Sequence, residues 1–143
     1  ANFTPADKPY VIGQADVLTR GGDVTICANG HLVWEALEAA NALESQGIHA
    51  EVINFSTIKP LDLETLLASV HKTGRVVTAE EHQRNGGLGD SIAQALAMHR
   101  PTPMEMVAVN DSFGESGTPA QLLTKYGLDA ANIVAAVKRV LTR

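Results

Sequence analysis

The chain has 143 residues, enough for one domain with a hydrophobic core. Sixteen acidic and eleven basic side chains give a formal charge of −5, which argues against a nucleic-acid partner, since such a partner favours a basic face. No apolar run approaches the roughly 20 residues that a membrane span requires, so we expect no membrane partner.

The start of the chain and its cysteine content fit a cytoplasmic location. Residues 1–5 lack the basic start and the apolar core of a signal peptide. Cys27 is the only cysteine in the sequence, which excludes an intrachain disulfide and a cysteine metal cluster. The chain begins at Ala1 and not at a methionine, as expected of a processed chain or of a piece of a longer one.

Residues 1–20 are polar and contain prolines, so we expect a linker or an extended N-terminal arm, followed by one domain over residues 21–143. Within that domain, four buried apolar stretches predict strands. They are residues 23–29, 50–55, 75–79 and 104–109. A weaker pattern predicts a fifth strand, near residues 10–13 or at an edge of the sheet.

Apolar residues at helical spacing follow each of the first three strands. We expect the first helix at residues 32–46, with Gly47 ending it through a left-handed cap. Asp62 is expected to cap the second helix and Gly74 to end it. The third helix begins after a glycine-rich turn and stops before Pro101.

Two further helices are expected after the last strand. Thr118 followed by Pro119 is typical of a helix start, and Gly127 would end that short helix. Asp129 would cap the final helix. Strands alternating with helices predict an α/β fold, a three-layer α/β/α sandwich around a mostly parallel sheet of four to five strands.

The segment most suggestive of chemistry follows the third strand, at the carboxyl end where such sheets present functional groups. It consists of Glu80, Glu81 and His82. A neighbouring carboxylate could tune His82 for acid–base chemistry near neutral pH. Successive residues on a strand point in alternating directions, however, so the three cannot converge on one point. We therefore favour a structural or interface role over catalysis.

Gly86, Gly87 and Gly89 lie in the turn that opens the third helix. Free backbone N–H groups at a helix start could hold an anion. The spacing is not that of the dinucleotide fingerprint. The alternative, which we favour, is a tight turn with positive φ at Gly87 or Gly89 and close packing of the helix against the sheet.

The loop after the fourth strand contains Asp111, Phe113 and Ser116. It is either a ligand or contact loop, or a shaped connection whose Phe113 covers the end of the sheet. Trp34 lies off the apolar stripe of the first helix and would pack on a neighbouring domain or contact a partner. No histidine pair has the spacing of a zinc motif, so we expect no metal site in this chain alone.

Several segments, in the family's order, resemble the C-terminal domain of transketolases, especially those built from two half-length subunits. They are residues 22–26, 36–40, 47–48, 52–54, 57–62, 80–82, 86–89, 111–117 and 126–128. The resemblance covers nearly the whole chain from about Ile12. Deoxyxylulose-phosphate synthases and 2-oxoacid dehydrogenase beta subunits share the architecture, but the Glu-Glu-His and Phe-Gly-Glu-Ser-Gly forms favour transketolase.

This resemblance implies an enzyme that uses thiamine diphosphate and Mg²⁺ to move two-carbon ketol units between sugar phosphates. The Gly-Asp-Gly…Asn-Asn signature of the diphosphate domain and the pyrimidine domain are both absent. The resemblance therefore implies an assembly and interface domain without the cofactor site, inactive alone. Its implied partners are the remaining transketolase domains or an N-terminal subunit, in a homodimer.

Two alternatives stay open from the residues. One is a free-standing α/β module that binds an anion or ligand at the glycine turn. The other is the C-terminal domain of a 2-oxoacid dehydrogenase beta subunit, which docks a partner protein.

Overall fold

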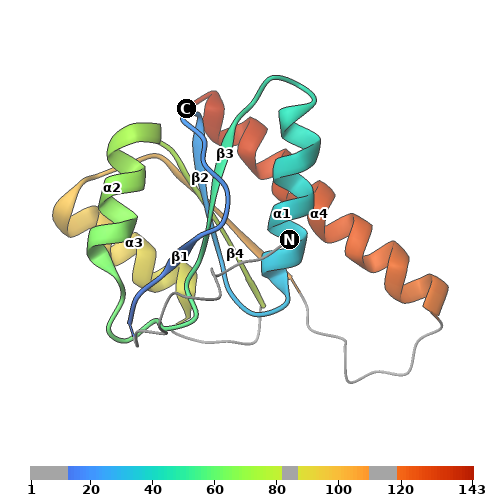
Figure 1. Cartoon of the computed structure of the whole chain (residues 1–143), viewed down its shortest axis with the longest axis horizontal. Helices are drawn as coiled ribbons and strands as arrows, with labels where there is room; N and C mark the ends of the chain where they lie inside the picture. The colour runs from blue at the N-terminus through green and yellow to red at the C-terminus, as the bar shows by residue number, and fades with distance from the viewer. Residues whose placement is uncertain (1–12, 82–86, 110–118) are drawn as a thin grey trace, which may run out of the picture.

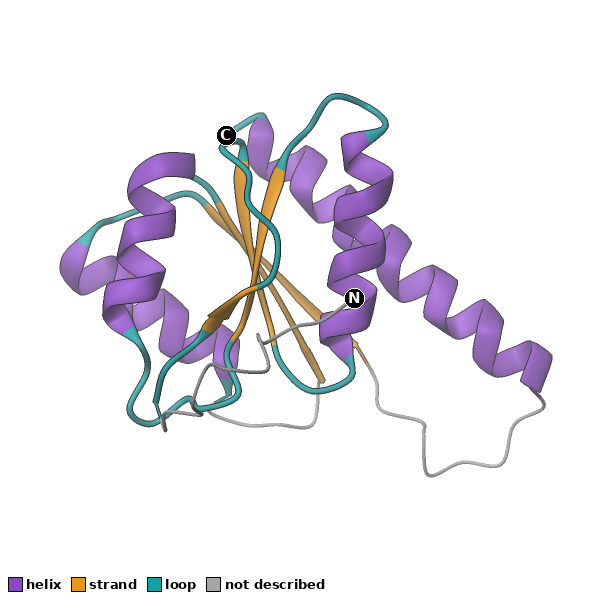
Figure 2. Cartoon of the chain, in the orientation of Figure 1, coloured by secondary structure: helices purple, strands orange, loops and turns teal. Residues whose placement is uncertain are grey.

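The structure is a computed structural model that describes residues 13–81, 87–109 and 119–143, and the side chains of residues 109 and 119–128 lie outside the description. It contains a five-stranded sheet with the strand order β1-β3-β2-β4-β5 (Figures 1 and 2). The strands are β1 (Asp16–Val17), β2 (Val24–Ala28), β3 (Ala50–Asn54), β4 (Val76–Glu81) and β5 (Met104–Val109). Strands β3, β2, β4 and β5 are parallel, and β1 pairs with β3 in the antiparallel sense.

Four helices cover the two faces of this sheet. They are α1 (Leu32–Glu44), α2 (Leu63–Thr73), α3 (Leu88–His99) and α4 (Pro119–Leu141). Figure 1 shows α1 and α4 on one side of the sheet and α2 and α3 on the other. The buried residues form two matching cores, one under each helix pair. The expected three-layer α/β/α sandwich with a mostly parallel sheet is confirmed.

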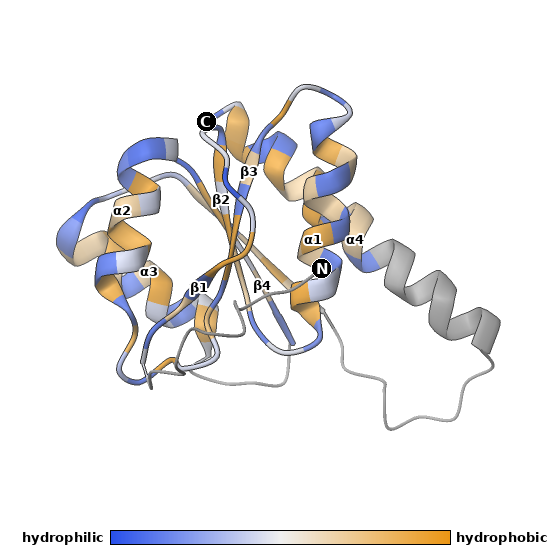
Figure 3. Ribbon diagram, in the orientation of Figure 1, coloured by the Kyte–Doolittle hydropathy of each residue, from blue (hydrophilic) through white to orange (hydrophobic). Residues whose placement is uncertain are grey.

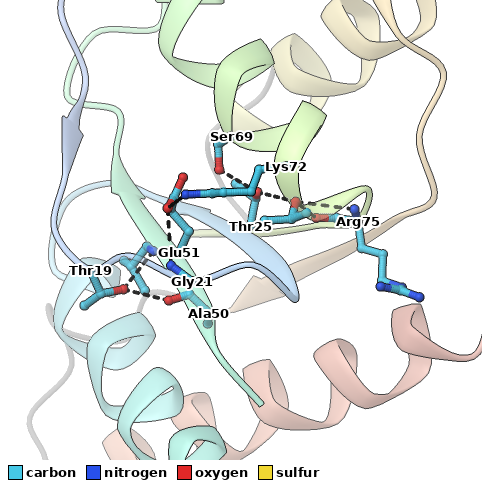
Figure 4. Close-up of polar contacts among 10 residues, drawn as sticks. Thr19, Gly21, Thr25, Ala50, Glu51, Ser69, Lys72 and Arg75 are labelled. Atoms are coloured by element: carbon cyan, nitrogen blue, oxygen red, sulfur yellow. Dashed lines mark hydrogen bonds and ion pairs between the residues drawn. The ribbon is translucent and has the colours of Figure 1, made fainter.

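The central strand β2 is buried along its whole length, as expected of a parallel strand covered on both faces. Figure 3 shows hydrophobic residues along the strands and on the helix faces that turn toward them. The one polar side chain in β2, Thr25, contacts α2, where its Oγ1 lies 2.7 Å from the hydroxyls of Ser69 and Thr73 (Figure 4). This bonding satisfies a hydroxyl that would otherwise be buried without a partner.

The predicted ends of α2 are confirmed. The carboxylate of Asp62 accepts hydrogen bonds from the Thr65 N–H at 3.1 Å and the Thr65 hydroxyl at 2.7 Å. It also accepts from the N–H of Ala15 at 2.8 Å, which ties the start of the described chain to this helix. Gly74 ends α2 in the left-handed conformation, with φ of 71°.

The structure corrects several element boundaries, among them both ends of β2, which spans Val24–Ala28 and not residues 23–29. Helix α1 ends at Glu44, two residues before the predicted end, although Gly47 has the expected positive φ of 79° in the turn that follows. Strand β3 ends at Asn54, one residue early. Strand β4 continues through Glu80 and Glu81, because these residues pair with the last two residues of β5.

The expected break at Gly127 is wrong. Helix α4 runs without interruption over 23 residues, so Gly127 and Asp129 lie inside it. A glycine in a helix costs only about 1 kcal/mol relative to alanine. The C-terminal half of α4 buries Ile133, Val137 and Val140 completely against the sheet, which offsets that cost.

Strand β1 lies at the sheet edge within the stretch expected to be an arm. The Thr19 hydroxyl donates to the Ala50 carbonyl at 2.9 Å and accepts from the Val52 N–H at 3.0 Å, which fixes the residues after β1 against β3. The expected fifth strand is therefore at an edge, while residues 10–12 lie outside the described residues. Where the domain begins stays a prediction.

Candidate interface at the carboxyl edge of the sheet

Glu80 and Glu81 end strand β4 and point to opposite faces of the sheet. Val77 and Ala79, which alternate with Glu80, belong to the core under α1 and α4, so Glu80 faces α3. Glu81 faces the α1 side, where it contacts His31. The prediction that these neighbours cannot converge on one point is confirmed for the two glutamates.

Glu80 caps helix α3 from the neighbouring strand. Its Oε2 accepts a hydrogen bond from the backbone N–H of Gly89 at 2.5 Å. The N-cap residue of α3 is Gly87, which has no side chain that could cap the helix. A carboxylate at this end also interacts favourably with the helix dipole. The chain's own carboxylate thus occupies the position that an external anion would use.

Gly89 lies where helix α3 packs closely on the sheet, although the nearest atom belongs to the end of the flexible, half-exposed Met106 side chain. A Cβ atom at this position would lie 2.5 Å from Cε of Met106 and 3.3 Å from Oγ1 of Thr78. Gly87 has a φ of −83°, and Gly89 is helical without a positive φ. The expectation of positive φ at Gly87 or Gly89 is therefore wrong, whereas the expected close packing of helix on sheet is confirmed. Gly86 lies outside the described residues.

Glu81 attaches the start of α1 to the end of strand β4. Its Oε1 lies 2.9 Å from Nδ1 of His31, which occupies the N-cap position of α1. The two side chains are 13% and 28% exposed, so water screens this pair only partly. His31 was not among the predicted site residues. The signal for it was its place directly after the first strand, at the same carboxyl edge as Glu81.

The remaining predicted site residues cannot be placed. His82, Asp111, Phe113 and Ser116 all lie outside the described residues.

Trp34 lies in the first turn of α1, near this edge, and is 56% exposed. A large exposed aromatic side chain is typical of a contact surface.

A second polar region lies away from this edge, where a surface cleft of about 590 Å³ runs between β1 and α2. At this cleft Glu51 bonds to Lys72 and to the N–H of Gly21 (Figure 4). Burial opposes ionisation of Glu51, but hydrogen bonds from Lys72, Ser69 and Gly21 outweigh it and hold its pKa below the usual range. Because these bonds already use this carboxylate, the network is structural.

The described residues contain neither a metal cluster nor a membrane-crossing helix. Among them, no group of three or more His, Cys, Asp or Glu side chains is placed to hold a metal ion. Within the same residues, no helix combines the length and the apolar surface that crossing a membrane requires.

The fold and the contacts at this edge define the class of protein. It is an α/β domain in which carboxylates at the end of a strand bind the starts of the domain's own helices. Comparison with known proteins gives the family. Residues 13–133 match the family model of the transketolase C-terminal domain. The chain belongs to this family, and the match favours the transketolase interpretation over both alternatives.

Two relatives are subunits of transketolases. The chain is 48% identical over 134 residues to the 6-deoxy-6-sulfo-D-fructose transketolase subunit SqwH of Clostridium sp. (strain MSTE9), covering 94% of this chain and 42% of the relative. It is 37% identical over 127 residues to one subunit of the apulose-4-phosphate transketolase of Phocaeicola vulgatus, covering 89% of this chain and 40% of the relative.

A solved structure gives the same result. A split gene transketolase, described as an inactive β4 tetramer, superposes with a TM-score of 0.84 and 48% sequence identity. The superposition covers 99% of this chain and 46% of that one. The chain therefore spans less than half the length of these relatives.

Proposed function

We propose that this chain is the assembly domain of a transketolase-type enzyme that transfers two-carbon ketol units between sugar phosphates. One observation carries the proposal. Glu80 and Glu81, the carboxylates best placed for chemistry, bond to Gly89 and His31 of the chain itself. They hold the starts of α3 and α1 in place at the edge where the loops emerge, so they shape a surface. The isolated chain is accordingly inactive.

The cofactor site belongs to other domains of the complete enzyme. Thiamine diphosphate, held with Mg²⁺, supplies the carbanion chemistry that carries the two-carbon unit. The signature that binds its diphosphate is missing from this sequence. This chain therefore contributes no catalytic residue and no cofactor ligand.

The partners follow from the same proposal. The carboxyl edge, with the exposed Trp34, faces the remaining transketolase domains or a second subunit, and the complete enzyme is a homodimer in the cytoplasm. Relatives that are subunits of transketolases support this assignment. The net charge of −5 supports the absence of a nucleic-acid partner, and the lack of a long apolar run supports the absence of a membrane partner.

The test separates assembly from chemistry in the complete enzyme. His31→Ala removes the partner of Glu81 and should loosen the carboxyl edge. Sedimentation should then show a smaller assembled fraction at low protein concentration. The rate per assembled enzyme, measured at high concentration, should stay within about three-fold of wild type. His49→Ala, an exposed histidine in the turn after α1, is the matched control. His82→Ala should behave like His31→Ala.

One outcome would overturn this assignment. If the rate per assembled enzyme falls about 100-fold or more while assembly is intact, the edge stabilises a transition state by about 2.7 kcal/mol and is catalytic.

A further inference from the structure

Glu35 is a buried acid in the contact between α1 and α4. It lies in the first turn of α1, and only 4% of the residue is exposed. Its Oε2 is fully buried and has no hydrogen-bond partner. An ionised carboxylate with such an oxygen loses its hydration without replacement, whereas a neutral carboxyl group loses far less.

The groups around Glu35 add to this cost. Asp129, on the facing helix α4, is itself only 7% exposed, and Glu38 lies one turn further along α1. Both are acids, and the N–H of Ala130 opposes their effect by donating a hydrogen bond to Glu35. His31, one turn earlier on α1, is engaged by Glu81. Lys125 precedes Asp129 by four residues in the sequence, and its side chain lies outside the description.

We propose that Glu35 and Asp129 form a proton-binding pair between α1 and α4, with Glu35 neutral in the packed domain, so that release of this proton weakens the attachment of α4. Like charges in a shared, dry site cannot both ionise without cost. Helix α4 is the C-terminal element, and its start follows residues 110–118. The pair therefore makes the packing of α4 against α1 depend on pH.

The direction follows from proton linkage. Burial first, and then the charges of Asp129 and Glu38, raise the pKa of Glu35 from its usual value of 4.5 to about 7. The folded state thus binds this proton more tightly than the unfolded chain does. The stabilisation is complete below about pH 4.5, is lost as the pH rises to about 7, and stays lost above that.

The experiment compares variants of the 143-residue chain by urea unfolding at pH 5, 6, 7 and 8. The wild-type midpoint should fall between pH 5 and 7. Glu35→Gln keeps the shape but carries no titrating proton, so its midpoint should not show this fall. At pH 8 its folding equilibrium constant should exceed that of wild type about ten-fold or more, since one pKa unit corresponds to ten-fold. Glu44→Gln, at the exposed end of the same helix, should follow wild type.

Two further measurements locate the effect. Asp129→Asn should shift the fall to lower pH without abolishing it, because burial is the larger cause. Hydrogen exchange, corrected for its intrinsic pH dependence, should speed up in residues 129–141 at pH 8 in wild type but not in Glu35→Gln.

Two results would overturn the proposal. One is a Glu35→Gln variant that is less stable than wild type at pH 8. The other is a variant that retains the full wild-type fall. If Glu35→Gln does not fold, carboxyl ¹³C NMR of wild type decides: titration of Glu35 near pH 7 supports the pair, and titration near pH 4.5 refutes it.

Discussion

Glu80 and Gly89 are nine residues apart in sequence, and the Glu80 Oε2 accepts the backbone N–H of Gly89 at 2.5 Å. The acceptor is the second-to-last residue of strand β4, and the donor lies in the first turn of α3. The sheet thus supplies the cap that the glycine-rich start of α3 cannot supply itself. Because this carboxylate already uses the N–H of Gly89, we expect the turn not to bind an external anion.

Glu80→Ala should lower the free energy of unfolding by about 1–2 kcal/mol, because α3 loses its cap and a charge that favours its dipole. Thermal or urea unfolding measures the loss. Glu44→Ala, at the exposed end of α1, is the control and should change stability little.

The same variant should also gain a response to phosphate. Removing the carboxylate frees the N–H of Gly89, so phosphate should stabilise Glu80→Ala saturably, while sodium chloride at matched ionic strength should not. Wild type should show no such gain. A saturable rise in the wild-type melting temperature would mean that the turn is an anion site after all.

Substitution by alanine should change stability very differently at the adjacent glycines Gly21 and Gly22. A Cβ at Gly21 would lie 2.5 Å from the backbone carbonyl carbon and oxygen of His49, and this backbone cannot move without disturbing β3. Gly21→Ala should cost roughly 2–4 kcal/mol. Gly22→Ala meets no atom within 4 Å and should change stability by less than about 0.5 kcal/mol. Equal losses from the two substitutions would contradict the close approach.

Lys72→Met should destabilise the domain at neutral pH by about 1–3 kcal/mol, because Glu51 is 2% exposed and loses a charged partner. Since its hydrogen bonds hold the pKa of Glu51 low, this stabilisation is present above its usual value near 4.5 and disappears as the pH falls below it. The difference between Lys72→Met and wild type should therefore shrink on acidification.

Urea unfolding at pH 7, 4.5 and 3 follows that difference. Lys138→Met, an exposed lysine on α4, serves as the control. A loss that persists unchanged at pH 3 would show that Lys72 acts through packing and not through its charge.

Cys27 should be inert toward thiol reagents in the folded chain. It is fully buried in β2, and burial raises the pKa of its thiol far above the usual range. At pH 8 a disulfide reagent should react with the folded chain only as fast as the domain opens, and at once in denaturant. Immediate reaction without denaturant would show that β2 is accessible.

Local chemistry made part of this structure predictable. Asp62 and Gly74 bound α2 as the sequence indicated, because a cap depends on residues a few positions away. The parallel order of the strands followed from their alternation with helices. The continuity of α4 through Gly127 could not be predicted in this way. It depends on packing of the helix against the sheet and not on the low intrinsic helix propensity of glycine.

The site was predictable in position but not in bonding. The carboxyl end of β4 was the expected place, and the alternation of Glu80 and Glu81 followed from strand geometry. The residues that these glutamates bind could not be predicted from the sequence. His31 and Glu81, for example, are 50 residues apart in sequence and come into contact only because β2 pairs with β4. The pair of Glu35 and Asp129 likewise required knowing that α1 packs on α4.

A domain that serves assembly alone should have no cofactor site of its own. Calorimetric titration of thiamine diphosphate, with Mg²⁺ present, tests this in the 143-residue chain and in the complete enzyme under the same conditions. We expect saturable binding to the complete enzyme and only heats of dilution with the chain. Saturable micromolar binding to the chain alone would contradict the proposed function.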